Sequence, residues 1–271
     1  MPEEQRTPVA LAIAGSDSGG GAGIQADLKA FAAVGVHGTT AITAITAQNT
    51  LGVTAIHAIP PEVIVAQVAA VAGDIGVDAV KIGMLGTTAT IDAVVEALAL
   101  TGDAPVVVDP VMVSESGASL LDDDARVALV ERVLPLATVV TPNIPEARAI
   151  TGLGAEASSE ELAAAIRALG PAAAIVTGGH ADGTDLFDDG GGPVPIPGPV
   201  HADGAAHGSG CTHSSTLAAL LAIGFPLRDA AREARRRAGD AVATGLRDVG
   251  AGPGPVDALD IASRRPRPPM P

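Results

Sequence analysis

Short apolar segments alternate with longer segments of helical periodicity along almost the whole chain, and this alternation limits the possible folds more than any other feature. Residues 8–15 form an apolar run that ends in glycine, which is typical of a buried strand. Residues 23–35 then place apolar side chains at helical spacing and end at a glycine. The same patterns predict strands at 39–46, 53–59, 78–84, 105–112, 137–143 and 172–179, and helices at 61–73, 87–100, 122–134, 145–151, 158–169, 211–223 and 227–246.

Strands that alternate with helices predict an α/β fold, with a mostly parallel central sheet and helices on both of its faces. Two short segments, 184–188 and 193–197, are typical of a hairpin. The sequence contains no linker and no internal repeat, so we expect a single domain over residues 1–271, with 1–7 and 264–271 as flexible tails. Ligands of such sheets bind at the carboxyl ends of the strands. The segments that follow the predicted strands are rich in Gly, Asn, Asp and Gln, as a binding site would be.

The chain has a formal net charge of −15 and only two lysines, Lys29 and Lys81. Such a charge repels nucleic acids and anionic membranes, so we expect neither as a partner. A polyanionic substrate would need local attraction from helix N-termini, backbone N–H groups or a divalent cation; an acidic surface that only aids solubility is the simpler alternative. No apolar run could span a bilayer, a single cysteine excludes an intramolecular disulfide, and the polar first residues lack a signal-peptide pattern. We therefore expect a cytoplasmic protein.

A glycine-rich segment, GSDSGGGAG at 15–23, follows the first predicted strand. It lacks the lysine of a Walker A loop. Residues 21–26 match the GxGxxG/A pattern of dinucleotide-binding folds, but no acidic residue follows about 20 positions later, which argues against that reading. A turn without function remains an alternative. We favour a close approach of this backbone to a ligand, with the side chain of Asp27 projecting towards the same ligand.

Two later strand ends carry carboxylates. Asp109 ends a strand of three valines, and Asn143 and Glu146 follow the next strand. Asp109 could be a structural cap, and Asn143 with Glu146 has the spacing of a helix capping box. The alternative is a Mg²⁺ site, because this ion prefers carboxylate, water and phosphate oxygens. Several such segments at one sheet edge favour the site.

Cys211 lies in the segment HGSGCT, just before a predicted helix. Gly208 and Gly210 leave the backbone amides there free to bind an anion, and the partial positive charge of a helix N-terminus suits phosphate oxygens. The same field lowers the pKa of a thiol. A buried cysteine is more often a small apolar residue, one thiol is a poor metal site, and a cysteine hydrolase needs an oriented base. His207 and His213 are near in sequence, but sequence alone does not orient them.

Together these segments resemble the hydroxymethylpyrimidine/phosphomethylpyrimidine kinases of thiamin biosynthesis, which belong to the ribokinase-like superfamily. The resemblance runs from about residue 8 to 256 and is carried, in family order, by AGSDSGGGAGIQADLKAF, ITAQNT, KIGMLG, DPVMVSESG, TPNIPEA and HGSGCT. It implies a three-layer αβα fold of the ribokinase type. It also implies two successive phosphoryl transfers from Mg·ATP, which convert 4-amino-5-hydroxymethyl-2-methylpyrimidine to its monophosphate and then to its diphosphate.

The resemblance also implies a role for individual positions. The pyrimidine would contact Asp27, Gln48, Ala22, Gly15, Met84 and Val111. The nucleotide would lie beside Asn143, Glu146, Thr177 and Thr212, and Mg²⁺ beside Asp109 and Glu146. Gly208, Ser209 and Gly210 would form the anion hole, and Cys211 would occupy the catalytic position.

The sequence departs from the family pattern in three places: Thr177 and Glu115 stand where relatives commonly have lysine, and Ala205-Ala206 replaces a polar pair. In addition, His213 replaces a residue that is usually apolar. The loss of two cations near a triphosphate predicts a raised KM for ATP, which a protonated His213 could offset.

Three other functions stay open from the sequence. A pyridoxal kinase of the same branch has a similar pocket, and Gln48 favours the pyrimidine over pyridoxal. A regulatory pyrimidine-binding protein without catalysis is supported only by the departures above. A cysteine hydrolase would need no ATP. We also expect a homodimer, because the family commonly dimerises.

Overall fold

The computed structural model describes residues 6–114, 117, 119–178, 183–201 and 205–266. The strands are β1 (Val9–Asp17), β2 (His37–Asn49), β3 (Gly52–Ala58), β4 (Ala79–Ile82), β5 (Val106–Val108), β6 (Val139–Val140), β7 (Ala173–Val176), β8 (Asp185–Asp188) and β9 (Val194–Ile196). The α-helices are α1 (Gly23–Val34), α2 (Pro61–Asp74), α3 (Thr88–Leu98), α4 (Asp123–Ala128), α5 (Ile144–Thr151), α6 (Ser159–Arg167), α7 (Ser209–Ala222), α8 (Leu227–Ala243) and α9 (Ile261–Arg264).

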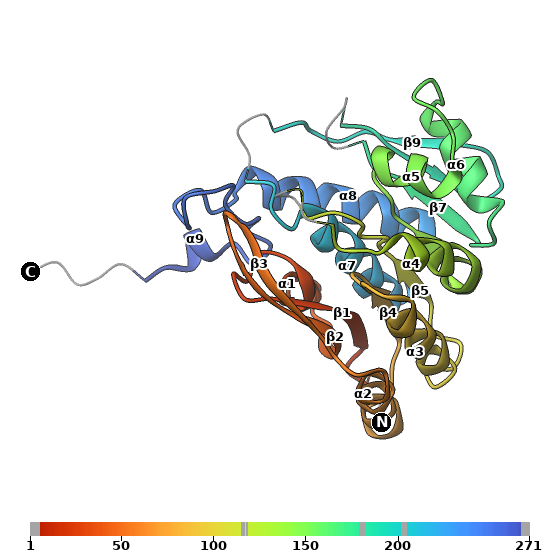
Figure 1. Ribbon diagram of the computed structural model, residues 1–271. Coiled ribbons are helices and arrows are strands. Elements are labelled where there is room, and N and C mark those ends of the chain that lie inside the picture. The colour runs from red at the N-terminus through yellow and green to blue at the C-terminus, as the bar shows by residue number, and fades with distance from the viewer. Residues whose placement is uncertain (1–5, 115–116, 118, 179–182, 202–204, 267–271) are drawn as a thin grey trace, which may run out of the picture.

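The described strands form one sheet in the order β3-β2-β1-β4-β5-β6-β7-β8-β9. The six central strands, β2, β1, β4, β5, β6 and β7, run parallel to one another. At the two ends of the sheet, β3 pairs antiparallel with β2, and β8 and β9 continue antiparallel from β7. The predicted mostly parallel sheet is therefore confirmed, as is the predicted hairpin, which is β8–β9. Helices connect the parallel strands, which places all their carboxyl ends on one edge (Figure 1).

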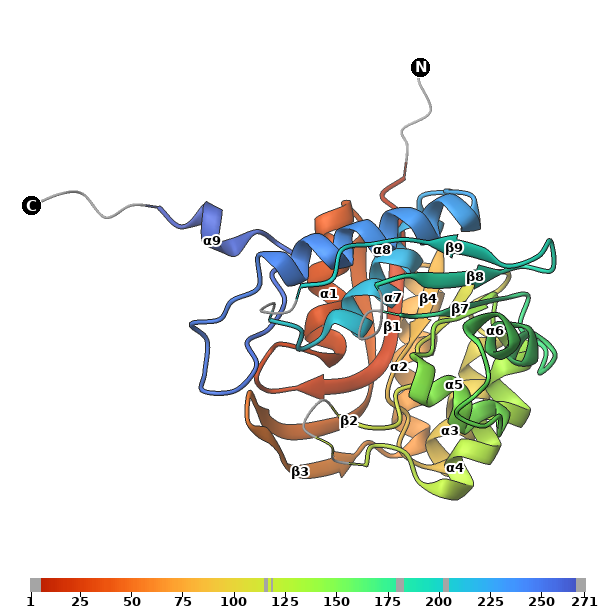
Figure 2. The same cartoon turned by 90° about the horizontal axis from the view of Figure 1, so that it is seen from above.

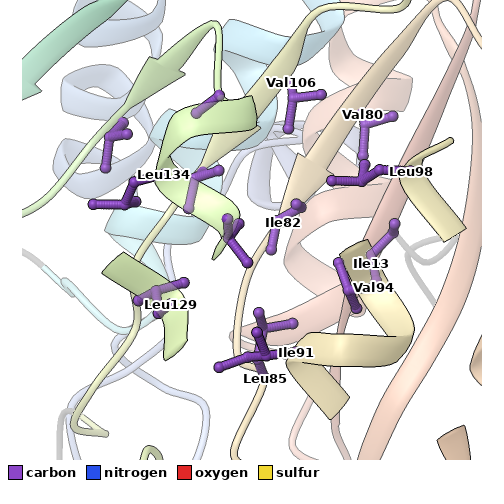
Figure 3. Packing of buried hydrophobic residues seen from close by; sticks show 14 of the residues in the cluster. Ile13, Val80, Ile82, Leu85, Ile91, Val94, Leu98, Val106, Leu129 and Leu134 are labelled. Carbon is purple, nitrogen blue, oxygen red and sulfur yellow. The ribbon is translucent and has the colours of Figure 1, made fainter. Parts of the chain in front are cut away.

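The sheet is covered on both faces, which gives three layers (Figure 2). Alternate residues of β1 point to opposite faces: Leu11 and Ile13 join the core under α2, α3, α4, α5 and α6, whereas Ala10 and Ala12 join the core under α1, α7 and α8. The first core is built from branched side chains that interdigitate between strands and helices (Figure 3). The alanines on the second face leave room for α1 and α7 to approach the sheet closely.

The predicted helix at 122–134 divides into three parts. An α-helical turn and a half, α4, is followed by a π-helical segment (Leu129–Val133) and a 3₁₀ turn (Leu134–Leu136). Pro135 lies in the last part and has no N–H to donate, so an α-helical hydrogen bond cannot form at that position.

The ends of the chain are partly ordered. Arg6, inside the segment predicted to be a tail, lies 3.2 Å from the carboxylate of Asp78. The short helix α9 ends at Arg264, the first residue of the other predicted tail; residues 1–5 and 267–271 lie outside the described part. Among the described residues, none of the helices is long and apolar enough to cross a membrane.

Candidate active site

A cavity of about 650 Å³ opens at the carboxyl edge of the parallel strands, between the sheet and the N-terminus of α7. Its size and its mixed lining are those of a small-molecule site. Most of the site residues expected from the sequence line it, although they come from six different strand ends and from the start of α7. These are Gly15, Ala22, Gln48, Met84, Asp109, Val111, Asn143, Glu146, Thr177, Gly208, Ser209, Gly210 and Cys211.

Two expected site residues lie behind the cavity wall instead. Asp27 is fully buried, where it lies 2.8 Å from Lys81 Nζ and accepts a hydrogen bond of 2.6 Å from Ser215 Oγ. Its side chain does not line the cavity, and its Oδ2 has no hydrogen-bond partner among the described residues. The expected projection towards a ligand stays a prediction that these contacts do not support. Burial, together with repulsion from Asp109, raises the pKa of Asp27 despite its favourable contacts with Lys81 and Ser215. Thr212 is also buried, and its hydroxyl has no hydrogen-bond partner within the described part of the chain.

Lys81 is the functional residue that the sequence reasoning missed most clearly. It extends from β4 to the floor of the cavity, 3.8 Å from Asp109 Oδ2, and its side chain is fully buried. Burial alone would lower the pKa of Lys81, but the carboxylates of Asp27 and Asp109 outweigh it and raise that pKa, so the ammonium stays charged. One of only two lysines, placed inside an apolar strand, was the signal available in the sequence.

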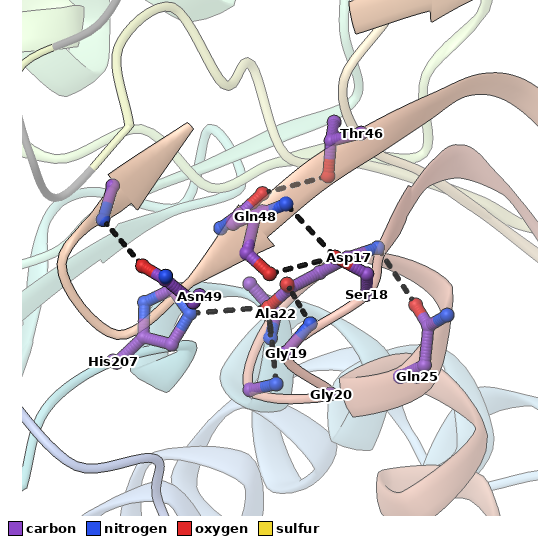
Figure 4. A network of polar contacts seen from close by, with 12 residues as sticks. Asp17, Ser18, Gly19, Gly20, Ala22, Gln25, Thr46, Gln48, Asn49 and His207 are labelled. Carbon is purple, nitrogen blue, oxygen red and sulfur yellow. Dashed lines mark hydrogen bonds and ion pairs between the residues drawn. The ribbon is translucent and has the colours of Figure 1, made fainter. Parts of the chain in front are cut away.

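The glycine-rich loop is shaped by Asp17, a second residue that was missed. Its carboxylate accepts hydrogen bonds from the backbone N–H groups of Gly19 (2.7 Å), Gly21 (3.0 Å) and Ala22 (2.8 Å), and lies 3.1 Å from His207 Nε2 (Figure 4). Burial would raise the pKa of Asp17, but His207 and the backbone donors outweigh it and lower that pKa. Asp17 is thus an ionised anchor of the loop. An aspartate two residues before a glycine, the pattern of a side-chain turn, was its signal.

The same loop makes a close approach to the start of α7. Gly208 has a φ of 82°, and a Cβ there would lie 1.8 Å from the carbonyl oxygen of Gly21. A Cβ on Gly21 would in turn lie 2.2 Å from the ring of His207. Gly21 and Gly208 therefore allow the two loops to contact each other, because neither position has room for a Cβ. Gly210 differs, because a Cβ on it would meet only open space.

Cys211 is partly exposed in the first turn of α7. The expectation that the helix N-terminus lowers the pKa of its thiol is wrong for the ligand-free protein. Burial raises the pKa of Cys211 to about 12, with further contributions from Asp109 and Asp27, and the opposing effects of Lys81 and the N–H of Gly23 are smaller. The thiol is therefore protonated at neutral pH before any ligand binds.

Asn143 and Glu146 form the capping box that the sequence left as one alternative. Asn143 Oδ1 accepts from the N–H of Glu146, and Glu146 Oε2 accepts from the N–H of Asn143, both at 2.9 Å. Both residues also line the cavity, so capping does not exclude a further role. Burial, followed by repulsion from Asp109, raises the pKa of Glu146 to about 8. Two carboxylates that repel each other at a cavity wall are suited to sharing a cation.

A polar cluster stands at the end of the cavity formed by α8. His213 Nε2 lies 3.6 Å from Asp185 Oδ2, and Arg235 Nε lies 3.5 Å from Asp185 Oδ1. Arg235 also donates a hydrogen bond of 2.7 Å to the carbonyl of Gly183. Burial, with Arg235 adding to it, lowers the pKa of His213, so the ring is neutral at pH 7. The offset that a protonated His213 could have given is therefore absent. Glu115, another departure from the family pattern, lies outside the described residues.

Comparisons with known proteins agree with this geometry. A family model described as phosphomethylpyrimidine kinase matches residues 17–257. A hydroxymethylpyrimidine/phosphomethylpyrimidine kinase of Rhizobium meliloti is 50% identical over 257 residues, which cover 92% of this chain and 96% of that protein. The crystal structure of phosphomethylpyrimidine kinase from Clostridium difficile has a TM-score of 0.75 and 40% identity, and the match covers 84% of this chain and 96% of the other.

A pyridoxal kinase is structurally similar as well. The enzyme of Staphylococcus aureus, in complex with AMP-PCP and pyridoxal, has a TM-score of 0.85 at 34% identity, with 94% of each chain covered. The fold is therefore shared by both kinds of kinase. The family model and the higher sequence identities favour the phosphomethylpyrimidine kinases over the pyridoxal kinases. From its fold, its cavity and these matches, the chain belongs to the phosphomethylpyrimidine kinase family.

Proposed function

We propose that this protein phosphorylates 4-amino-5-hydroxymethyl-2-methylpyrimidine with Mg·ATP, first to the monophosphate and then to the diphosphate. The observation that carries the proposal is the cavity itself, which combines an apolar end, two carboxylates and an uncapped helix N-terminus in a chain of this family. These are the parts that a transfer of phosphate to a small aromatic alcohol needs.

The pyrimidine would bind at the end of the cavity formed by β1, β2 and β4. Met84 lies against Gly15, where a Cβ would come within 2.6 Å of its Cε, and Ala22 and Val111 add small apolar walls. Thr46 Oγ1 donates a hydrogen bond of 3.1 Å to Gln48 Oε1 and so fixes the amide. That amide then presents its NH₂ group to the polar edge of a pyrimidine ring.

Mg²⁺ and the nucleotide would occupy the rest of the cavity. The oxygens of Asp109 and Glu146 suit Mg²⁺, which commonly takes one or two carboxylates and completes its shell with water and phosphate oxygens. Bound there, the ion would neutralise charge on the phosphates that are transferred. Asn143 and Thr177 line the same cavity and would lie beside the nucleotide, and AMP-PCP in the related pyridoxal kinase supports ATP as the phosphate donor.

The chain itself would stabilise the transferred phosphoryl group through α7. The amides of Gly210 and Cys211 lie at an N-terminus where no side chain caps the helix, so they would face phosphate oxygens. The N–H of Ser209 instead donates a hydrogen bond of 2.9 Å to the carbonyl oxygen of Ala206. The first acceptor is an alcohol that loses a proton, whereas the second acceptor is already a phosphate. Cys211 would receive that proton only once bound substrates lower the pKa of its thiol, which burial raises to about 12.

Pyridoxal is the second candidate substrate, because the pyridoxal kinase structure superposes with a higher TM-score than the pyrimidine kinase structure does. An assay of ADP release with each alcohol separates the two. We expect the pyrimidine alcohol to give the higher kcat/KM. A higher value for pyridoxal would overturn the assignment, and binding of the pyrimidine without ADP release would indicate a regulatory protein.

A homodimer is the expected assembly. The half-exposed side chains of Ile45 and Ile56, on the antiparallel pair β2–β3 at the sheet edge, support it as apolar contact positions. Sedimentation velocity is the test: a species of twice the 26.5 kDa chain mass is expected, and a monomer at all concentrations would contradict it.

A further inference from the structure

Lys81 is a buried residue to which the proposed reaction assigns no role. It comes from β4, between two strands that end at the cavity, and its side chain has no exposed surface. The chain makes room for it, because a Cβ on Gly83 would lie 2.9 Å from its Nζ. Removing a cation from water is costly, so such an ammonium is retained only where its charge is compensated.

Two carboxylates and two serines compensate and fix this charge. Lys81 Nζ lies 2.8 Å from Asp27 Oδ1 and 3.8 Å from Asp109 Oδ2. Ser215 Oγ donates to the same oxygen of Asp27 at 2.6 Å, and Ser214 Oγ donates to the same oxygen of Asp109 at 3.0 Å. Both serines belong to α7, the helix that begins with the expected anion hole and carries the single thiol.

The arrangement therefore joins the floor of the cavity to the helix above it. Asp109 is the carboxylate expected to hold Mg²⁺, and its position relative to α7 depends on Ser214 and Lys81 together. Asp27 contacts Lys81 but is not part of the cavity lining. In a chain with a net charge of −15, Lys81 also supplies positive charge beneath the site where phosphates would bind.

We propose that Lys81 is a positioning residue of the phosphoryl-transfer centre, which holds Asp109 in place relative to the N-terminus of α7 and keeps a fixed positive charge on the cavity lining that it shares with Cys211. In this arrangement Asp27 is the counter-ion of Lys81 and not a ligand of the substrate. The expected change in kcat rests on the proposed function. The expected change in the reactivity of Cys211 does not, because it needs no substrate.

The alternative is an ion pair that serves the fold alone. Neutral replacement of both partners of a buried pair often leaves stability nearly unchanged, whereas removal of one partner leaves an unpaired charge. The main variant is therefore Lys81→Met with Asp27→Asn, and the matched control is Arg132→Met with Asp92→Asn, which removes an exposed pair outside the cavity lining. The single variant Asp27→Asn keeps the ammonium beside Asp109.

The readout for charge is the alkylation rate of Cys211 by iodoacetamide at a fixed pH, because the chain has no other cysteine. We expect the Lys81→Met/Asp27→Asn protein to react about threefold or more slowly, the change that half a pKa unit produces. Its kcat for the pyrimidine alcohol should fall about tenfold or more while KM changes less than about twofold, as expected for lost positioning. The control protein should match the wild type in both measurements.

Asp27→Asn alone separates the readings if the double variant does not fold. We expect it to alkylate at least as fast as the wild type and to keep KM for the pyrimidine within about twofold. A tenfold rise in the KM of Asp27→Asn for the pyrimidine would show that Asp27 binds the substrate. A folded double variant with the alkylation rate and kcat of the wild type would show that Lys81 is only structural. Either result overturns the inference. If the wild type phosphorylates neither alcohol, the proposed function fails, but the alkylation rates still test the charge at Lys81.

Discussion

The two glycines expected to form the anion hole have different local geometry, and alanine at each should therefore have a different effect. At Gly208 the φ of 82° is the left-handed conformation, which costs about 1–2 kcal/mol for a residue with a Cβ. The new Cβ would also lie 1.8 Å from the carbonyl oxygen of Gly21, so the loop held by Asp17 must shift. We expect Gly208→Ala to lower Tm by at least about 3 °C, since 1 kcal/mol corresponds to about 2–4 °C at this size.

At Gly210 the same substitution should stabilise the protein. The residue lies inside α7, and nothing stands within 4 Å of a Cβ built there. Alanine is favoured over glycine in a helix by up to about 1 kcal/mol, so Gly210→Ala should raise Tm by about 2–4 °C. The open space is the cavity, however, and a methyl group there would occupy the place of phosphate oxygens. We expect kcat/KM for ATP to fall about tenfold or more despite the higher Tm.

Differential scanning fluorimetry and an ADP-release assay measure these two effects separately. Loss of activity together with a gain of stability in Gly210→Ala cannot come from unfolding, so it would locate the phosphates at this helix start. A Gly210→Ala protein with higher Tm and wild-type kcat/KM would refute the anion hole. A Gly208→Ala protein with unchanged Tm would refute the close contact between the two loops.

Three further predictions concern single residues. Cys211→Ala and Cys211→Ser should slow the first phosphoryl transfer more than the second, because only the alcohol acceptor loses a proton; equal loss in both steady-state rates would leave the thiol a positional role alone. Thr177→Lys should lower KM for ATP in initial-rate assays by restoring a cation on the cavity lining, and an unchanged KM would show that Thr177 is remote from the nucleotide. Burial lowers the pKa of His213, so its ring binds a proton more readily in the unfolded chain than in the folded one. Protonation therefore favours unfolding, and His213 makes the free energy of unfolding fall as the pH drops through 6.5. The loss of Tm between pH 7.5 and pH 5.5 should be smaller in His213→Gln, and an equal loss would show that the ring is not a source of acid sensitivity.

The fold was largely predictable because its pattern is local. The alternation of Leu11 and Ile13 with Ala10 and Ala12 is a period of two along one strand, and it corresponds to two cores on opposite faces of the sheet. The break after α4 was not predicted, because the helical side-chain periodicity continues through Leu129–Val133 although the backbone there is π-helical.

The site was only partly predictable, because its contacts join residues far apart in the chain. Motif order selected most of the cavity lining, but it could not show that Asp27 faces Lys81 and Ser215 instead of a ligand. The thiol of Cys211 shows the same limit. A helix N-terminus was visible in the sequence, whereas the burial and the neighbouring carboxylates that raise its pKa exist only in the folded chain.

The central claim is that one cavity adds two phosphates in succession to the same pyrimidine. Mass spectrometry of the products formed from 4-amino-5-hydroxymethyl-2-methylpyrimidine with Mg·ATP counts these phosphates directly. The account predicts a monophosphate that appears first and is then converted to the diphosphate. A reaction that ends at the monophosphate, or a mixture in which the alcohol stays unmodified while pyridoxal is phosphorylated, would contradict it.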